Sequence, residues 1–235
     1  MNDSFWPIPA VLAFRAIISA NDPNPASQRT DALAVNTIIL DIDGTLVDSM
    51  GVDPKLYFSS IERVLGPVCL RDLNDYDHVT DSGVLGQILK ENGFSGAGDL
   101  AASVKALFMK ELKRHIDDTG SFPVIDGAIQ FIDRVRRSTD TRIAIATGCW
   151  RESALLKLQT SGFNIEGIPV ATSDDSPSRV EIMQSALQMT GRDAEPVTYF
   201  GDAEWDQVAC QDLGWNFVAV GPRLGGISSF SSIQL

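Results

Sequence analysis

Two aspartates, Asp41 and Asp43, stand two positions apart in the run Asp41-Ile42-Asp43-Gly44-Thr45. Two carboxylates this close cannot both be buried and charged unless a cation or a proton compensates them. A second acidic group lies farther along the chain, in Gly201-Asp202-Ala203-Glu204-Trp205-Asp206. Mg²⁺ suits such oxygen-only sites, because it binds a few carboxylates together with waters and phosphate oxygens. The sequence therefore predicts a magnesium site, provided that the fold brings the two acidic groups together.

The elements that must position these acids are short apolar segments with the character of buried strands. Residues 34–40 are rich in β-branched side chains and end at the first acidic group, and residues 196–200 end at the second. A third segment, 142–146, ends at Thr147-Gly148. Ligands of parallel sheets bind beyond the carboxyl ends of the strands. We therefore expect the polar residues that follow these three strands to share one edge of a sheet.

Strand-like and helix-like segments alternate along most of the chain. The expected strands are 34–40, 142–146, 168–171, 196–200 and 215–220, and the expected helices between them are 126–137, 151–161, 178–190 and 204–212. Repeated strand-helix units form parallel sheets with right-handed crossovers and helices on both faces. The predicted fold class is α/β, with a Rossmann-like core.

The stretch from about 53 to 120 has apolar residues at helical spacing and no clear strand, so it predicts an all-helical insertion after the first strand. The expected organisation is an N-terminal extension over 1–34, with a short amphipathic helix at 8–19, an α/β core and a helical cap. The core comprises residues 35–50 and 121–235, and the cap comprises residues 51–120.

With these motifs in place, the chain resembles the haloacid dehalogenase superfamily, in the helical-cap branch of phosphoglycolate phosphatases and phosphoglucomutases. Asp41 to Val47 matches the first motif of that family, DxDGT, and Thr147 matches the second. Arg179 stands where the third motif has Lys or Arg, and Gly201 to Asp206 has the GDxxxD form of the fourth. The order of four motifs, each after an expected strand or at a helix start, makes the resemblance specific.

The resemblance implies a magnesium-dependent phosphatase that acts on a small phosphomonoester. By analogy with the family, Asp41 attacks phosphorus and forms an aspartyl-phosphate that water then hydrolyses. Asp43 protonates the leaving alcohol and later deprotonates water, which calls for a pKa tuned toward neutrality. Mg²⁺ is implied to bind Asp41, the backbone carbonyl of Asp43 and Asp202, with Asp206 as a direct or water-mediated ligand.

The resemblance also implies which residues hold the substrate. Thr147, beside Gly148, is expected to bind a phosphoryl oxygen through its hydroxyl and its backbone N–H, and Arg179 is expected to stabilise the charge of the transferring group. In similar capped enzymes a cap loop selects the substrate.

The cap loop of this chain offers His78, Asp81 and Ser82 as specificity candidates. The alternative for this loop is an N-cap segment, with Asp81 or Ser82 capping a helix that begins at Val84.

Three alternative functions remain open on sequence grounds. A sugar-phosphate mutase would keep the same motif residues. A haloacid dehalogenase is disfavoured, because such enzymes lack an aspartate equivalent to Asp43 and need no metal. A catalytically silent binding or regulatory module is disfavoured by the intact set of motif residues.

Composition restricts the partners and the location. The chain of 235 residues has 31 acidic and 19 basic side chains and a net charge of −12, which opposes nucleic-acid binding. It has no apolar stretch near the ~20 residues that a membrane helix needs. The segment 11–20 is broken by Arg15 and lacks a basic flank, so a secretory signal is not expected. The three cysteines, scattered and odd in number, fit a reducing cytoplasm.

Overall fold

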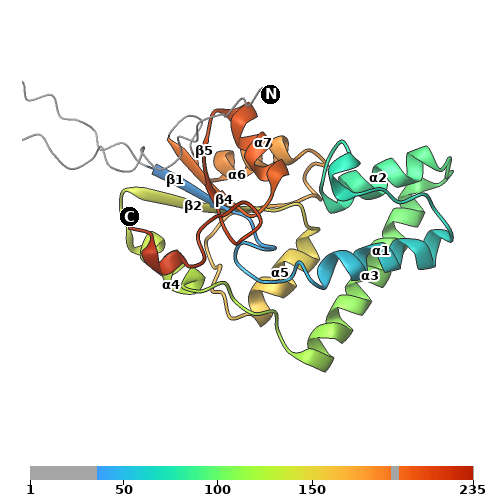
Figure 1. Ribbon diagram of the computed structural model, residues 1–235, viewed down its shortest axis with the longest axis horizontal. Coiled ribbons are helices and arrows are strands. Elements are labelled where there is room, and N and C mark those ends of the chain that lie inside the picture. Colours follow the sequence, from blue (N-terminus) through green and yellow to red (C-terminus); the bar gives the residue numbers. More distant parts are fainter. Residues whose placement is uncertain (1–35, 192–195, 235) are drawn as a thin grey trace, which may run out of the picture. The chain divides into compact units, whose positions relative to one another are not determined.

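A five-stranded, wholly parallel sheet forms the centre of the computed structural model, which describes residues 36–191 and 196–234 (Figure 1). The strand order is β3-β2-β1-β4-β5. The strands are β1 (Asn36–Leu40), β2 (Thr141–Ala146), β3 (Val170–Ala171), β4 (Val197–Gly201) and β5 (Asn216–Ala219). The predicted α/β, Rossmann-like fold is confirmed, whereas the expected extension and its helix at 8–19 lie outside the described residues.

Helices cover both faces of the sheet. They are α4 (Ala128–Arg137), α5 (Arg151–Thr160), α6 (Arg179–Met189) and α7 (Glu204–Leu213). Side chains of a strand alternate between faces, so Ile38 and Leu40 join one apolar cluster with α4 and α5. Ile39 between them joins the other cluster, with α6 and α7. Strands that are buried on both faces explain why the sequence shows continuous apolar runs rather than alternation.

The strand at the edge beside β2 is shorter than expected. Residues 168–171 predict four strand residues, but β3 has only two, Val170 and Ala171. Pro169 precedes them and has no N–H to donate to a neighbouring strand, although its carbonyl accepts the N–H of Ile145.

The stretch between β1 and α4 is helical. It contains α1 (Asp53–Leu65), the 3-10 turn η1 (Leu73–Asp75), α2 (Asp81–Glu91) and α3 (Ala97–Thr119), and the structure describes no strand among residues 53–119. In Figure 1 these helices lie beyond the end of the sheet to which β1 leads, with α1 packed along α3. The division into a core and a cap at residues 51–120 stays a prediction.

The start of α2 differs from both options that the sequence offered. The helix begins at Asp81, three residues before Val84, and its cap is neither Asp81 nor Ser82. Thr80 is the N-cap, because its hydroxyl oxygen accepts the N–H of Gly83 at 3.0 Å. This shift leaves Asp81 free to interact elsewhere through its side chain.

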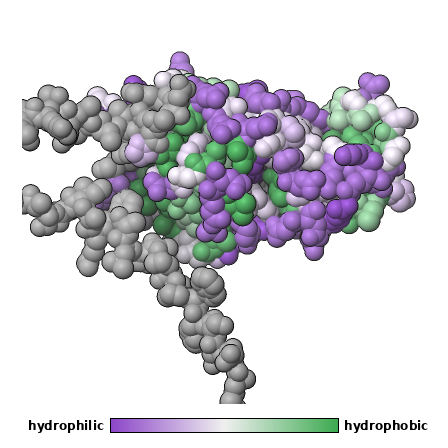
Figure 2. Space-filling model, turned by 90° about the horizontal axis from the view of Figure 1, so that it is seen from above, coloured by the Kyte–Doolittle hydropathy of each residue, from purple (hydrophilic) through white to green (hydrophobic). Residues whose placement is uncertain are grey.

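None of the described helices is long and apolar enough to cross a membrane. Figure 2 shows one face of the molecule, on which hydrophilic residues predominate and hydrophobic residues form smaller groups between them.

Candidate active site

Three buried carboxylates meet at the carboxyl ends of two neighbouring strands. Asp41 follows β1, Asp202 follows β4, and Asp206 lies in the first turn of α7; one oxygen of each lies within 4.8 Å of the others. The strands β2 and β3, which follow β1 in the chain, lie on one side of it, whereas β5, which follows β4, lies on the other side of the pair. Ligands of open α/β sheets bind at the point where the strand order changes direction in this way. The structure thus brings together the two acidic groups.

The burial of Asp41 and Asp202 is only partly compensated. Burial and the neighbouring Asp206 raise the pKa of Asp41 well above its ordinary range, and the same two causes raise the pKa of Asp202 to about 7. One oxygen of Asp41, Oδ1, is buried and has no hydrogen-bond partner among the residues that the structure describes. A cation at the cluster would satisfy this oxygen and restore the ionised form of the aspartates.

Gly44 allows the two acidic groups to approach each other. Its φ of +75° is one that other residues rarely adopt, and a Cβ at this position would lie 2.4 Å from Oδ2 of Asp202. A side chain at residue 44 would therefore displace Asp202. This explains in physical terms why a glycine follows the two aspartates.

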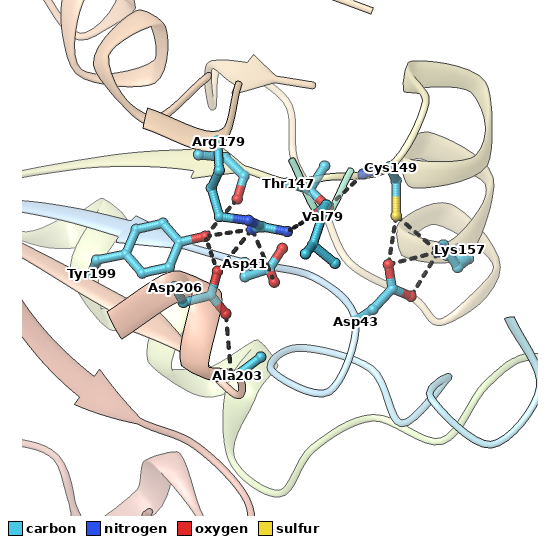
Figure 3. Close-up of polar contacts among 11 residues, drawn as sticks. Asp41, Asp43, Val79, Thr147, Cys149, Lys157, Arg179, Tyr199, Ala203 and Asp206 are labelled. Atoms are coloured by element: carbon cyan, nitrogen blue, oxygen red, sulfur yellow. Dashed lines mark hydrogen bonds and ion pairs between the residues drawn. The ribbon is translucent and has the colours of Figure 1, made fainter. Parts of the chain in front are cut away.

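Arg179, the first residue of α6, points into the site and not to the surface (Figure 3). Its Nη1 lies 2.8 Å from Oδ1 of Asp206 and 3.7 Å from Oδ2 of Asp41, and Nη2 donates to the carbonyl of Val79 at 3.1 Å. Burial lowers the pKa of Arg179, but Asp206 and Asp41 outweigh burial, so the guanidinium is charged. Arg179 can therefore bind an anion that approaches Asp41.

Thr147 and Gly148 lie where the sequence predicts, after β2, and both line the same pocket as Asp41. The prediction that the backbone N–H of Thr147 binds phosphate is wrong, because this N–H donates to the carbonyl of Ala171 in β3 at 3.1 Å. The hydroxyl oxygen of Thr147 accepts the N–H of Cys149 at 3.3 Å, and its proton is left to donate to a ligand.

Asp43 faces away from the carboxylate cluster. Figure 3 shows its side chain directed toward Lys157 and Cys149, whereas Asp41 lies beside Arg179. Lys157 Nζ donates to both carboxylate oxygens of Asp43, at 2.6 and 2.8 Å, and the Cys149 thiol donates at 2.6 Å.

The pKa of Asp43 differs from the expected value near neutrality. Burial raises this pKa, but the Lys157 ammonium and hydrogen bonds from Cys149, Lys157 and Ser49 outweigh burial and hold it below its ordinary value. The expectation is therefore wrong for the arrangement in this structure, where Asp43 is an ionised carboxylate.

Lys157 is the main residue that the sequence analysis missed. It lies in α5 with a side chain that is fully buried, and its Nζ also donates to Oδ1 of Asp53, the first residue of α1, at 2.9 Å. A lysine is almost never fully buried unless it is paired. The sequence signal was weak: Lys157 lies on the buried face of α5 with Ala154 and Leu158, but Leu155 and Leu156 lie outside that face, so the helix has no distinct apolar side.

The three cap candidates occupy different positions. Asp81 lines the pocket, and its Oδ2 accepts the backbone N–H of Trp150 at 2.8 Å. Burial and the nearby Asp53 raise the pKa of Asp81 to about 8. The indole N–H of Trp150 donates to the hydroxyl oxygen of Ser82 at 3.0 Å, and Ser82 does not line the pocket. His78 is exposed. Of the three, only Asp81 faces the space beside Asp41.

The cavity at Asp41 has a volume of about 90 Å³ and opens to solvent. The residues that line it come from the strand ends and from the helical stretch after β1: Asp41, Asp43, Met50, Asp53, Pro54, Tyr57, Phe58, Leu73, Val79, Thr80, Asp81, Val84, Thr147, Gly148, Cys149, Arg179, Asp202 and Trp205. Asp41, Asp202 and Arg179 line it at the sheet edge, and most of the apolar side chains come from the helical stretch.

Comparisons with known proteins agree with this geometry. A family model for haloacid dehalogenase-like hydrolases matches residues 38–220. No curated protein matches the sequence.

Similar solved structures include a hydrolase from Pseudomonas syringae, with 19% identity, a TM-score of 0.62 and coverage of 78% of this chain and 84% of that one. CbbY from Rhodobacter sphaeroides, in complex with phosphate, has 15% identity, a TM-score of 0.61 and coverage of 85% and 90%. Beta-phosphoglucomutase from Clostridium difficile has 15% identity, a TM-score of 0.62 and coverage of 79% and 84%. At these identities the likeness shows a shared fold.

Proposed function

This chain belongs to the haloacid dehalogenase-like hydrolase family, and we propose that it is a magnesium-dependent phosphatase that hydrolyses a small phosphomonoester through Asp41. The observation that carries the proposal is the cluster of Asp41, Asp202 and Asp206 within 4.8 Å, with Arg179 3.7 Å from Asp41. A nucleophilic carboxylate beside a fixed cation and two further acids suits phosphoryl transfer, in which positioning and charge stabilisation supply most of the catalysis.

In the proposed reaction, an oxygen of Asp41 attacks phosphorus and the bond from phosphorus to the alcohol oxygen breaks. The aspartyl-phosphate then reacts with water, which regenerates Asp41 and releases phosphate. Arg179 binds the equatorial phosphoryl oxygens, where charge is spread in the transition state. The Thr147 hydroxyl donates to the same group.

Asp43 has to move to act as the acid and base. Lys157 and Cys149 now hold its carboxylate in the ionised form, away from Asp41. When Asp43 turns toward the leaving alcohol it loses these partners, and burial, which raises its pKa, becomes the dominant cause. The same change that brings Asp43 to the substrate therefore also favours its protonation.

The donor set fits Mg²⁺, because all three clustered side chains are carboxylates and Oδ1 of Asp41 has no other partner in the described part of the chain. Asp41 and Asp202 would hold the ion together with the backbone carbonyl of Asp43, and Asp206, already paired with Arg179, would hold it directly or through a water. When bound, Mg²⁺ would neutralise the cluster and polarise the phosphoryl oxygens.

Removal of the metal is expected to abolish activity. Phosphate release from 4-nitrophenyl phosphate should be measured with EDTA and after addition of Mg²⁺. We expect a loss of at least about 10³-fold with EDTA that Mg²⁺ restores, because the carboxylates otherwise repel the substrate anion. Equal rates with and without Mg²⁺ would contradict the proposal.

A further inference from the structure

Apolar side chains line much of the pocket, beside the carboxylates of Asp53 and Asp81. Pro54 and Phe58 of α1, Leu73 of η1 and Val84 of α2 line it from the helical stretch, and Trp205 of α7 lines it from the sheet edge. These apolar side chains come from four separate elements, so the apolar surface is built by the packing of the helical stretch against the sheet edge.

Each polar side chain that lines the pocket from the helical stretch already has at least one hydrogen-bond partner. The hydroxyl of Tyr57 donates to the carbonyl of Asp81 at 2.6 Å, and Oδ2 of Asp81 accepts the Trp150 N–H. Asp53 accepts from Lys157. A substrate rich in hydroxyl groups would therefore lose hydrogen bonds to water and find few partners here, at a cost for each group left unpaired.

The pocket also lacks a second site for an anion. Arg179 is the one Lys, Arg or His among the described residues that line it, and its guanidinium is beside Asp41 and Asp206. Asp53 and Asp81 are the carboxylic acids on the helical side. A second phosphate or a carboxylate on the substrate would therefore meet acidic or apolar groups, and the net charge of −12 adds to this repulsion.

Resting on the proposed phosphatase function, we infer that the substrate is a phosphomonoester of an uncharged, apolar alcohol, whose hydrocarbon part lies against Phe58, Leu73 and Trp205. The phosphoryl group lies at Asp41 and Arg179, and the ester oxygen lies between the two ends of the pocket. Sugar phosphates and bisphosphates are poorer substrates, because the apolar wall offers them neither hydrogen bonds nor a counter-charge.

A series of n-alkyl phosphates from ethyl to hexyl tests this inference, because the leaving alcohols differ in apolar area but hardly in reactivity. With Mg²⁺ present, kcat/KM is expected to rise about fourfold for each added methylene until the pocket is filled. Glucose 6-phosphate and fructose 1,6-bisphosphate serve as hydroxyl-rich and doubly anionic probes. We expect each to have at least about tenfold lower kcat/KM than hexyl phosphate.

Phe58→Ala tests the position of the hydrocarbon part. It is expected to lower kcat/KM for hexyl phosphate about tenfold, mainly through KM, and to leave ethyl phosphate within about twofold. Phe94→Ala is the matched control, because Phe94 is also a half-buried phenylalanine of the helical stretch but does not line the pocket. The control should leave both substrates unchanged.

The failure of this inference is distinguishable from failure of the phosphatase proposal. If neither the alkyl phosphates nor 4-nitrophenyl phosphate is hydrolysed with Mg²⁺, the phosphatase function itself is wrong. If phosphate esters are hydrolysed but kcat/KM does not rise with chain length, or glucose 6-phosphate exceeds hexyl phosphate, the apolar substrate class is overturned and the phosphatase function stands. An equal effect of Phe58→Ala on ethyl and hexyl phosphate would also overturn it.

Discussion

Replacing Asp41 by Asn is expected to lower Mg²⁺-dependent phosphate release by about 10⁴-fold or more. The amide has nearly the shape of the carboxylate but cannot attack phosphorus, and removing a covalent nucleophile removes the catalytic route and not only one contact. The rate should be measured under saturating Mg²⁺ and 4-nitrophenyl phosphate, so that the comparison reports kcat.

Asp48→Asn is the matched control for this variant, because Asp48 is exposed in the same loop and has no place in the site. It should retain full activity. Asp41→Asn should also fold, since it removes one charge from a buried cluster in which burial and Asp206 raise the pKa of Asp41. A well-folded Asp41→Asn protein with more than a tenth of the wild-type rate would exclude Asp41 as the nucleophile.

Replacing Lys157 by Met is expected to destabilise the protein by about 3–5 kcal/mol. The substitution leaves two buried carboxylates, Asp43 and Asp53, without the cation that lies 2.6 to 2.9 Å from both. Removing one partner of a buried ion pair costs this much because the other charge stays desolvated. Urea unfolding at pH 7 measures the effect as a lower midpoint at unchanged slope.

Two further variants test whether the uncompensated charge of Asp43 and Asp53, and not the loss of a long side chain, causes the destabilisation. Lys113→Met removes an exposed lysine that pairs with Glu152 at the surface, and should cost less than about 1 kcal/mol. Asp53→Asn in the Lys157→Met background removes one uncompensated carboxylate and should regain part of the lost stability. If the Lys157→Met protein were as stable as wild type, the ion pairs of Lys157 with Asp43 and Asp53 would not stabilise the fold.

The positions of Asp41 and Asp202 could be predicted because they depend on a simple rule. Both aspartates follow apolar segments, and the carboxyl ends of parallel strands share one edge of a sheet. The helices on the sheet were equally accessible, because they fill the intervals between the expected strands. Arg179 was predicted from the resemblance to the family's third motif, and it is the first residue of α6.

Other features depend on contacts between residues far apart in the sequence. The direction of the Asp43 side chain is set by Lys157, 114 residues later, and no local pattern near residue 43 reveals this partner. The backbone N–H of Thr147 is taken by β3, a two-residue strand whose exact register the sequence does not specify. Thr80 caps α2 because its backbone is extended at that point. Several neighbouring polar residues could also cap a helix, so the sequence does not single out Thr80.

The apolar wall of the pocket was also beyond sequence reasoning. Phe58 and Leu73 lie in different elements and have the spacing of ordinary core residues, so nothing in the sequence distinguishes them from the core. Their role depends on how the helical stretch after β1 lies against the strand ends. This arrangement carries the inference about the substrate, whereas the motif residues carry the inference about the reaction.

The most direct test of the central claim is to identify the residue that carries the phosphoryl group during turnover. The enzyme should be mixed with Mg²⁺ and substrate, quenched in acid and treated with borohydride, which reduces an aspartyl-phosphate to homoserine, and its peptides should be analysed by mass spectrometry. Homoserine at position 41 and aspartate at position 43 is the expected result. Aspartate at position 41 in an enzyme trapped during active turnover, or homoserine at another position, would contradict the proposed mechanism.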